Sequence, residues 1–135
     1  MQIYAQEFCK YMDANDIKYV EKKDHVIKVT YTGDNLDSIP VFVIFDEDND
    51  PLVQFKCWDI ANFKNNVGKA IEICNSLNAE YRWVKFYVDS DNDIIASIDA
   101  VLDINTCGSH CMTLVRRVVN IVDEAYPQIA RARWA

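Results

Sequence analysis

Residues 80–101 read EYRWVKFYVDSDNDIIASIDAV, and this stretch decides the fold. Apolar and aromatic residues dominate 80–88 and 94–101, which is typical of β-strands. Residues 89–93 between them are Asp, Ser, Asp, Asn and Asp, which favour tight turns because their short side chains cap their own backbone. The stretch therefore predicts a β-hairpin.

A second hairpin precedes this one along the chain. Residues 39–45 and 52–57 are rich in valine, isoleucine and phenylalanine, and they flank the acidic turn 46–51. Two further short strands are expected at 18–21 and 25–32, joined by a polar turn. Because short turns join these strands, the sequence predicts a mainly antiparallel sheet.

Apolar residues recur at helical spacing near the N-terminus, in the middle and near the C-terminus of the chain. The spacing predicts helices over 3–12, 63–77 and 109–126. Pro127 is expected to end the last helix because proline cannot donate a backbone hydrogen bond. Helices at these three places around a mainly antiparallel sheet place the chain in the α+β class.

The composition indicates one packed domain in a reducing compartment. The chain has 135 residues, 50% of them hydrophobic, so we expect 1–135 to form a single domain. The formal net charge of -7 argues against nucleic acid as a partner, because phosphate backbones attract basic proteins. No segment approaches the ~18 to 20 apolar residues that cross a bilayer, so no membrane partner is expected. Five cysteines, mostly in apolar segments, and the absence of a leader pattern predict a cytoplasmic location.

Two clusters of residues could be interpreted as metal-binding sites. The acidic residues at 89, 91 and 93 alternate like the start of an EF-hand loop, but Ile94 stands where glycine is needed and Ala100 where a glutamate should close the shell. Cys107, His110 and Cys111 offer soft ligands, yet a zinc site needs a fourth one nearby. We therefore predict no metal or cofactor, and a redox or metal role for these three residues stays open.

No catalytic signature is present. The sequence has no GxSxG elbow and no glycine-rich phosphate loop. Its carboxylates gather in turns, where water keeps their pKa values ordinary. The chain is therefore expected not to be an enzyme.

The candidate binding residues lie on the predicted strand over 80–88. Alternation places Val84, Phe86 and Val88 on one face and puts large aromatic side chains on the other. Aromatic residues on the second face favour burial against another polypeptide, or equally against a helix of the same chain. The last helix is apolar around much of its girth and needs cover on more than one side. The candidate interface residues are Tyr81, Trp83, Lys85, Tyr87, Leu114 and Ile121.

Several stretches resemble the YbjN-like domain family of bacterial regulators, whose fold is similar to the class I type III secretion chaperones. The resemblance rests on residues 77–89, on 101–103 and on 121–127, and it covers most of the chain from about Tyr19 to Pro127. It implies an α-βββ-α-ββ-α arrangement that is commonly dimeric and has protein partners. It implies no active-site residues, because the family has none to carry over.

The sequence thus predicts a non-enzymatic, homodimeric module that binds another polypeptide or regulates it. The alternative is a small acidic domain that binds a ligand or metal, or an enzyme of unknown reaction. A dimer interface or partner surface around the aromatic residues of 80–88 distinguishes the first hypothesis from the second.

Overall fold

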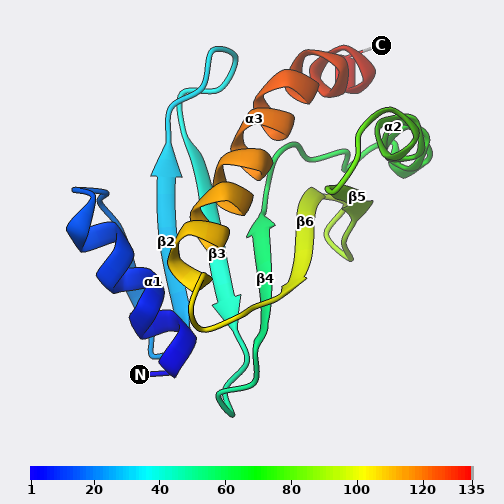
Figure 1. Ribbon diagram of the computed structural model, residues 1–135. Helices are drawn as coiled ribbons and strands as arrows, with labels where there is room; N and C mark the ends of the chain where they lie inside the picture. The colour runs from blue at the N-terminus through cyan, green and yellow to red at the C-terminus, as the bar shows by residue number, and fades with distance from the viewer. Residues whose placement is uncertain (135) are drawn as a thin grey trace.

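The computed structural model describes residues 1–134 as three helices and a six-stranded sheet (Figure 1). The strands lie in the order β1-β2-β3-β4-β6-β5, and every neighbouring pair is antiparallel. None of the helices within residues 1–134 combines the length and the apolar character that crossing a bilayer requires. The elements are α1 (Ile3–Ala14), β1 (Val20–Lys23), β2 (Val26–Tyr31), β3 (Ile39–Phe45), β4 (Leu52–Cys57), α2 (Val67–Glu80), β5 (Lys85–Val88), β6 (Ile94–Val101) and α3 (Cys107–Trp134).

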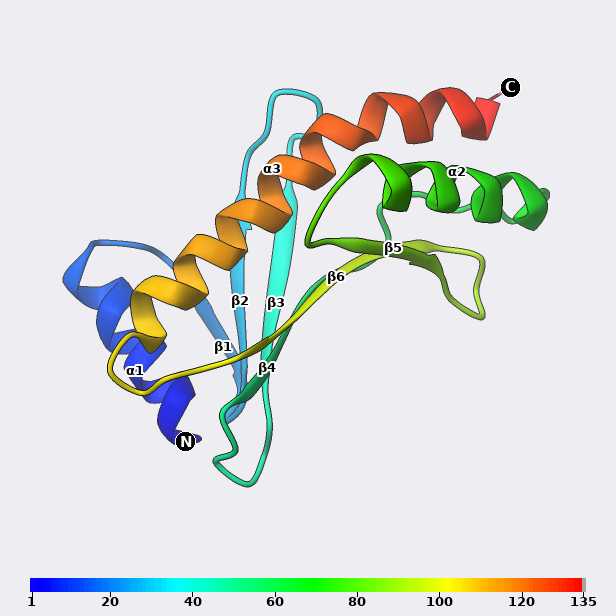
Figure 2. The ribbon, with the colours of Figure 1, turned by 45° about the vertical axis from the view of Figure 1, so that its right-hand side comes forward.

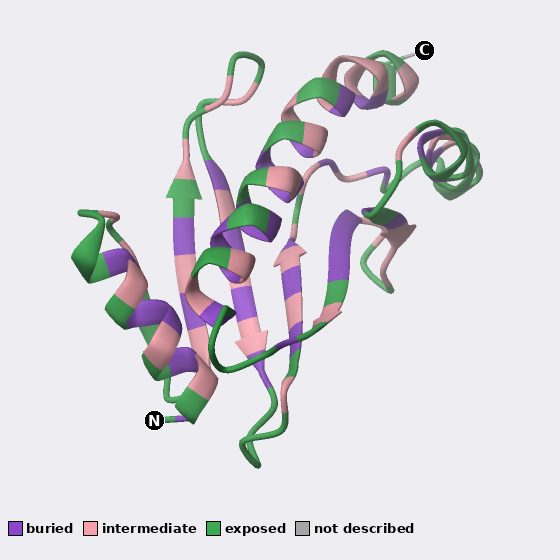
Figure 3. Cartoon of the chain, viewed as in Figure 1, coloured by how far each residue is buried: buried purple, intermediate pink, exposed green. Residues whose placement is uncertain are grey.

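The helices gather on one face of the sheet. α1 and α3 cross the front of the sheet in Figure 1, and α2 runs beside α3 above β5 in Figure 2. The residues of β3 alternate between buried and half-buried, so every second side chain enters the core beneath α3 (Figure 3). The cross-strand pairs Ile27 with Val43 and Phe55 with Ile98 continue this core through the sheet. The predicted α+β class with a mainly antiparallel sheet is confirmed.

One strand more than the resemblance implies precedes the middle helix. Residues 20–23 form a short, fully exposed strand at one edge of the sheet, with an irregular register between Glu21 and Lys23. Exposure, lysine side chains and an irregular register discourage another strand from pairing there. The arrangement is therefore α-ββββ-α-ββ-α.

The other edge strand, β5, is covered by a side chain of α2. The Phe86 N–H donates to Oδ1 of Asn78 at 2.7 Å, and Nδ2 of Asn78 donates to the Phe86 carbonyl at 3.0 Å. The amide of Asn78 thus takes the place of a neighbouring strand at the outward-facing groups of Phe86.

The predicted boundaries of the middle helix are wrong at both ends. Its N-cap is Asn66, whose side chain accepts a hydrogen bond from the Lys69 N–H, so the helix begins at Val67 rather than at residue 63. Phe63 is buried in the segment before it and contributes to the core without being helical. The helix continues to Glu80, three residues beyond its predicted end, and so takes the first residue of the predicted strand.

The predicted strand over 80–88 is consequently wrong in its first half. Tyr81 caps α2, and a bend follows in which Trp83 adopts a φ of 76°. Only Lys85–Val88 is strand, with Phe86 facing the core and Tyr87 facing away. Alternation in the sequence could not reveal this, because aromatic residues suit a strand, a helix cap and an exposed bend alike.

The last helix does not end at Pro127, and the reason lies in a distant loop. Proline removes the hydrogen bond that the Asp123 carbonyl would otherwise accept within the helix. Nδ2 of Asn35 donates to that carbonyl at 3.0 Å, so the orphaned acceptor is satisfied. The helix therefore continues to Trp134, and Arg131 and Arg133 lie in its last turn rather than in a loose tail.

The same loop is fastened by the Asp123 side chain. Its carboxylate accepts hydrogen bonds from the backbone N–H groups of residues 34, 35 and 36 at 2.9, 2.8 and 3.0 Å. Burial would raise the pKa of Asp123, but these backbone donors outweigh it and lower the pKa. Glycine suits position 33 beside them, because a Cβ there would overlap the Asp123 carboxylate.

A candidate protein-binding site

An exposed tryptophan marks the first candidate surface. Trp83 is 63% exposed and has a positive φ of 76°, a backbone conformation that bulky residues rarely adopt. The guanidinium of Arg117 on α3 lies 4.9 Å from the centre of the indole ring, within range of a cation–π interaction. The bend before β5 is thereby attached to α3 through an aromatic side chain that stays largely open to solvent.

Two of the predicted interface residues flank Arg117 on the same helix. Leu114 precedes it by three positions and Ile121 follows it by four, which places all three on one stripe of α3. Leu114 is 8% exposed and belongs to the core, whereas Ile121 is half-buried. We call Trp83, Arg117 and Ile121 the Trp83 patch. The sequence offered no signal for Arg117, since its partner comes from a bend that the pattern predicted as a strand.

Tyr81 lies beneath this surface rather than on it. Its ring is half-buried, with its centre 6.5 Å from that of Phe86. Burial raises the pKa of Tyr81 to about 12, and the nearby charges of Glu124 and Glu80 add to the shift. Its hydroxyl is buried and has no hydrogen-bond partner among the described residues. Tyr81 therefore anchors the end of α2 to the core.

The second candidate surface is the face of the sheet that the helices leave open. Side chains of β2, β3, β4, β5 and β6 that point away from the core line it, and Trp58 joins them just after β4. The rings of Phe42 and Trp58 lie 4.7 Å apart. We call this the open sheet face. Its members are Val26, Lys28, Thr30, Pro40, Phe42, Ile44, Gln54, Lys56, Trp58, Lys85, Tyr87, Ile95, Ser97 and Asp99.

Lysines are interleaved with the aromatic rings on the open sheet face. Nζ of Lys56 lies 6.0 Å from the centre of the Trp58 ring, and Nζ of Lys85 lies 5.7 Å from that of Tyr87. A hollow of about 550 Å³ borders the Phe42 and Trp58 rings. The predicted residues Lys85 and Tyr87 are thus two members of a larger surface, which the strand register reveals and the local sequence does not.

The six predicted residues therefore divide between two places. Lys85 and Tyr87 lie on the open sheet face, while Trp83 and Ile121 form the Trp83 patch with Arg117. The expectation that Tyr81, Trp83 and Tyr87 share one strand face is wrong, because the strand begins only at Lys85.

In the acidic turn after β5, a carboxylate accepts hydrogen bonds from the backbone of the turn itself. Oxygens of Asp89, Asp91 and Asp93 lie within 4.8 Å of one another. Oδ1 of Asp89 accepts hydrogen bonds from the backbone N–H groups of Asp91 and Asp93 at 2.9 and 3.0 Å. Burial and then the charge of Asp93 raise the pKa of neighbouring Asp59. These contacts explain the acidic residues as a capped turn.

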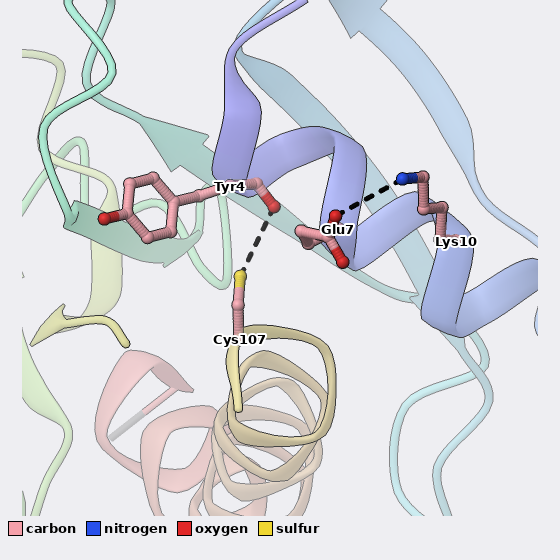
Figure 4. Close-up of polar contacts among 4 residues, drawn as sticks. All are labelled: Tyr4, Glu7, Lys10 and Cys107. Carbon is pink, nitrogen blue, oxygen red and sulfur yellow. Dashed lines mark hydrogen bonds and ion pairs between the residues drawn. The ribbon is translucent and has the colours of Figure 1, made fainter. Parts of the chain in front are cut away.

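The cysteines at the start of α3 serve the packing of α1. The Cys107 thiol donates to the Tyr4 carbonyl at 3.3 Å, next to the exposed ion pair of Lys10 and Glu7 (Figure 4). A hydrogen bond with Cys107, together with burial, raises the pKa of Cys111, which keeps it a thiol. His110 is half-buried on the next turn. Within residues 1–134, Cys107, His110 and Cys111 do not form part of a group that could hold a metal ion.

The order and pairing of the elements define the class of the protein. A six-stranded antiparallel sheet with one helix-covered face and helices at its beginning, middle and end is an α+β domain, and its fold is similar to that of a chain of the ExoU-SpcU complex of a type III secretion system. The chain belongs to the YbjN family, described as "Putative bacterial sensory transduction regulator", whose family model matches residues 5–131. The resemblance stated from the sequence is confirmed.

Solved structures of low sequence identity also match the chain. YbjN from E. coli matches with a TM-score of 0.69 and 10% sequence identity, covering 94% of this chain and 91% of that one. A chain of the heterodimeric complex ExoU-SpcU from the type III secretion system of Pseudomonas aeruginosa gives 0.54 and 9%, covering 91% and 94%. The type III secretion chaperone SycH of Yersinia pestis, in complex with a stable fragment of YscM2, gives 0.46 and 11%, covering 87% and 98%. No curated protein matches the chain.

Proposed function

We propose that this protein is a non-enzymatic, homodimeric module of the cytoplasm that binds another polypeptide and acts through that binding. One observation carries the proposal: the open sheet face is lined by aromatic and aliphatic side chains that no helix among residues 1–134 covers. A sheet with one solvated face normally carries polar residues there. Rings such as those of Phe42, Trp58 and Tyr87 are typical of surfaces that bind protein.

The structural relatives support a polypeptide ligand. The ExoU-SpcU structure is described as a heterodimeric complex, so a domain of this fold occurs in an assembly with a different protein. Fold alone does not determine function, so the argument rests on the surface of this chain. The open sheet face supplies the contact area, and its register aligns Lys85 with Phe42 in one row across four strands.

We assign self-association to the Trp83 patch. A tryptophan held in a strained conformation and stacked by an arginine, yet 63% exposed, gains apolar burial if a second copy covers it. The patch lies on the helical side of the molecule, so a dimer formed there leaves the open sheet face free for a partner. Leu114 supports the patch from within the core.

Sedimentation equilibrium tests the dimer with a matched pair of variants. Trp83→Ala should shift the protein to monomers at concentrations where the wild type is dimeric. Trp134→Ala is the control, because Trp134 is 78% exposed and is also stacked by an arginine at 4.9 Å, but lies at the far end of α3. A wild type that is monomeric at every concentration, or an assembly that Trp83→Ala does not change, contradicts this part of the proposal.

Affinity capture tests the partner surface. Wild-type protein and the variant Tyr87→Ala are immobilised, exposed to extract of the cells that make the protein, and the recovered proteins are identified by mass spectrometry. We expect one polypeptide that the wild type retains and the variant loses, while circular dichroism stays unchanged. Equal recovery by both proteins argues against the open sheet face as the binding surface.

A further inference from the structure

Five side chains form a row across the open sheet face. Direct Cα partners in successive strands connect Lys28 to Phe42, Phe42 to Lys56, Lys56 to Ser97, and Ser97 to Lys85. Neighbouring strands lie about 4.8 Å apart, so consecutive lysines of the row are separated by about 10 Å across the sheet. We call these five residues the lysine row.

The positive charge of the lysine row is not neutralised within the domain. None of its three lysines lies within ion-pair distance of a carboxylate among residues 1–134. The face itself carries one acidic residue, Asp99, which is exposed and pairs with Gln54 rather than with a member of the row. Three ammonium groups thus gather on one face of a chain whose net charge is -7.

Ser97 supplies an independent indication of a ligand. It is 1% exposed, and its Oγ has no hydrogen-bond partner among the described residues. Buried hydroxyl groups almost always have a partner, because leaving one unpaired is costly. The two residues that flank Ser97 on its own face are Lys56 and Lys85. Ser97 and its two lysine neighbours in the register all carry hydrogen-bond donors, so the three residues together lack only an acceptor.

We propose that Lys56, Ser97 and Lys85 bind a carboxylate from an extended, acidic segment of a different polypeptide. This inference rests on the proposed function and specifies the chemistry of its partner. The flexible lysine side chains move apart, the Ser97 hydroxyl donates to one carboxylate oxygen, and both ammonium groups neutralise the charge. Lys28 binds a second carboxylate three strand spacings from Ser97, about 14 Å away, which an extended chain spans in about four residues.

Aromatic residues of the partner have a place beside this site. Trp58 and Tyr87 lie along the open sheet face next to the lysine row, and the hollow bordered by Phe42 and Trp58 adjoins them. Side chains that stack there bury apolar area while the carboxylates fix the register of the segment. The complementary segment therefore combines acidic and aromatic residues.

The protein's own acidic turns do not fit this role. The turn between β3 and β4 is tied to the start of α1, because the Ile3 N–H donates to Asn49 at 3.0 Å and Gln2 donates to the Asp50 carbonyl at 3.1 Å. The turn between β5 and β6 is closed by the bonds to Asp89. Neither is extended or carries aromatic residues, so a second copy is not the expected occupant.

Fluorescence anisotropy tests the site with synthetic probes. The probe is a fluorescein-labelled peptide of four Glu-Glu-Phe repeats, and the matched probe replaces each glutamate with glutamine. We expect the acidic probe to bind at least about tenfold more tightly than the glutamine probe, with affinity falling as salt rises. Lys56→Gln and Lys85→Gln should each weaken it about three- to tenfold, and the control Lys64→Gln, an exposed lysine before α2, should not.

Ser97→Ala separates a binding role from a structural one. Its hydroxyl has no partner in the free protein, so we expect an unchanged or slightly higher melting temperature. The same variant should bind the acidic probe about tenfold more weakly, because a hydrogen bond to a charged group is lost. Weaker binding with unchanged stability supports the site, whereas lost stability with unchanged binding overturns it.

The remaining outcomes distinguish this inference from the function on which it rests. If both probes bind equally and only Tyr87→Ala weakens them, the carboxylate site is refuted while polypeptide binding stands. If neither probe binds and Lys56→Gln instead abolishes self-association or the binding of phosphatidylserine vesicles, the occupant is a second copy or a membrane, and the inference is overturned.

Discussion

Replacing Asn78 with alanine should uncover the edge of β5. The variant removes the two hydrogen bonds, at 2.7 and 3.0 Å, that satisfy the outward-facing N–H and carbonyl of Phe86. Each such bond contributes about 1 kcal/mol net, and alanine returns about 0.5 kcal/mol as the better helix former. We therefore expect Asn78→Ala to lower the free energy of unfolding by about 1.5 kcal/mol and the melting temperature by about 5 °C.

Asn75→Ala provides the matched control. Asn75 lies on the same helix, is exposed, and has no side-chain hydrogen bond among the described residues, so its replacement should be neutral or raise stability by about 0.5 kcal/mol. Urea unfolding followed by circular dichroism measures both variants, and sedimentation at rising concentration checks whether the freed edge pairs with another chain. Equal stability of the two variants would refute the role assigned to Asn78.

Three further predictions follow from the bend at Trp83 and from the loop held by Asp123. Asp123→Asn should lower the free energy of unfolding by about 1 kcal/mol at pH 7, as the loss of a helix cap does. Because the folded state has the lower pKa for Asp123, this difference from wild type should hold above pH ~4. It should vanish in acid unfolding curves as the pH falls through the folded pKa. Gly33→Ala should destabilise by about 1–3 kcal/mol in urea unfolding, since the new methyl group meets Asp123 and Ile39, and equal stability would contradict the packing described. Trp83→Gly should be more stable than Trp83→Ala by about 1 kcal/mol in thermal melts, because glycine adopts a positive φ without steric strain. The reverse order of stability would show that the bend is unstrained.

The sheet could be predicted from the sequence because its signals are local. Residues 39–45 and 52–57 are rich in valine, isoleucine and phenylalanine on either side of an acidic turn, and β3 and β4 have those bounds. The family resemblance agreed with the order of helices and sheet segments. Because residues 39–45 are apolar throughout, their composition predicts the strand but not which of its side chains enter the core.

The errors arose where distant contacts override local preference. Pro127 is a helix breaker by its own chemistry, and the Asn35 side chain from a distant loop supplies the donor that the proline cannot. Trp83 was placed in a strand because nothing next to it in the sequence indicates a positive φ. Its partner Arg117 comes from another element, so the pair is visible only in the folded chain.

The candidate site was predictable only in part for the same reason. Lys85 and Tyr87 were identified from the alternation of their own strand. Lys56, Ser97 and Trp58 join them through strand register, which places β6 between β4 and β5 although both β5 and β6 follow α2 in the chain. Sequence patterns identify a single strand well, but they do not show which strands lie next to it in the sheet.

The bond from Asn35 to the Asp123 carbonyl has a consequence for how this family can change over time. Pro127 cannot donate to the Asp123 carbonyl, and the side-chain amide of Asn35 does so instead. The amide is no longer needed there once residue 127 can donate. Exchanges at the two positions should therefore be inherited as a pair, and a lineage that alters one first passes through a less stable intermediate.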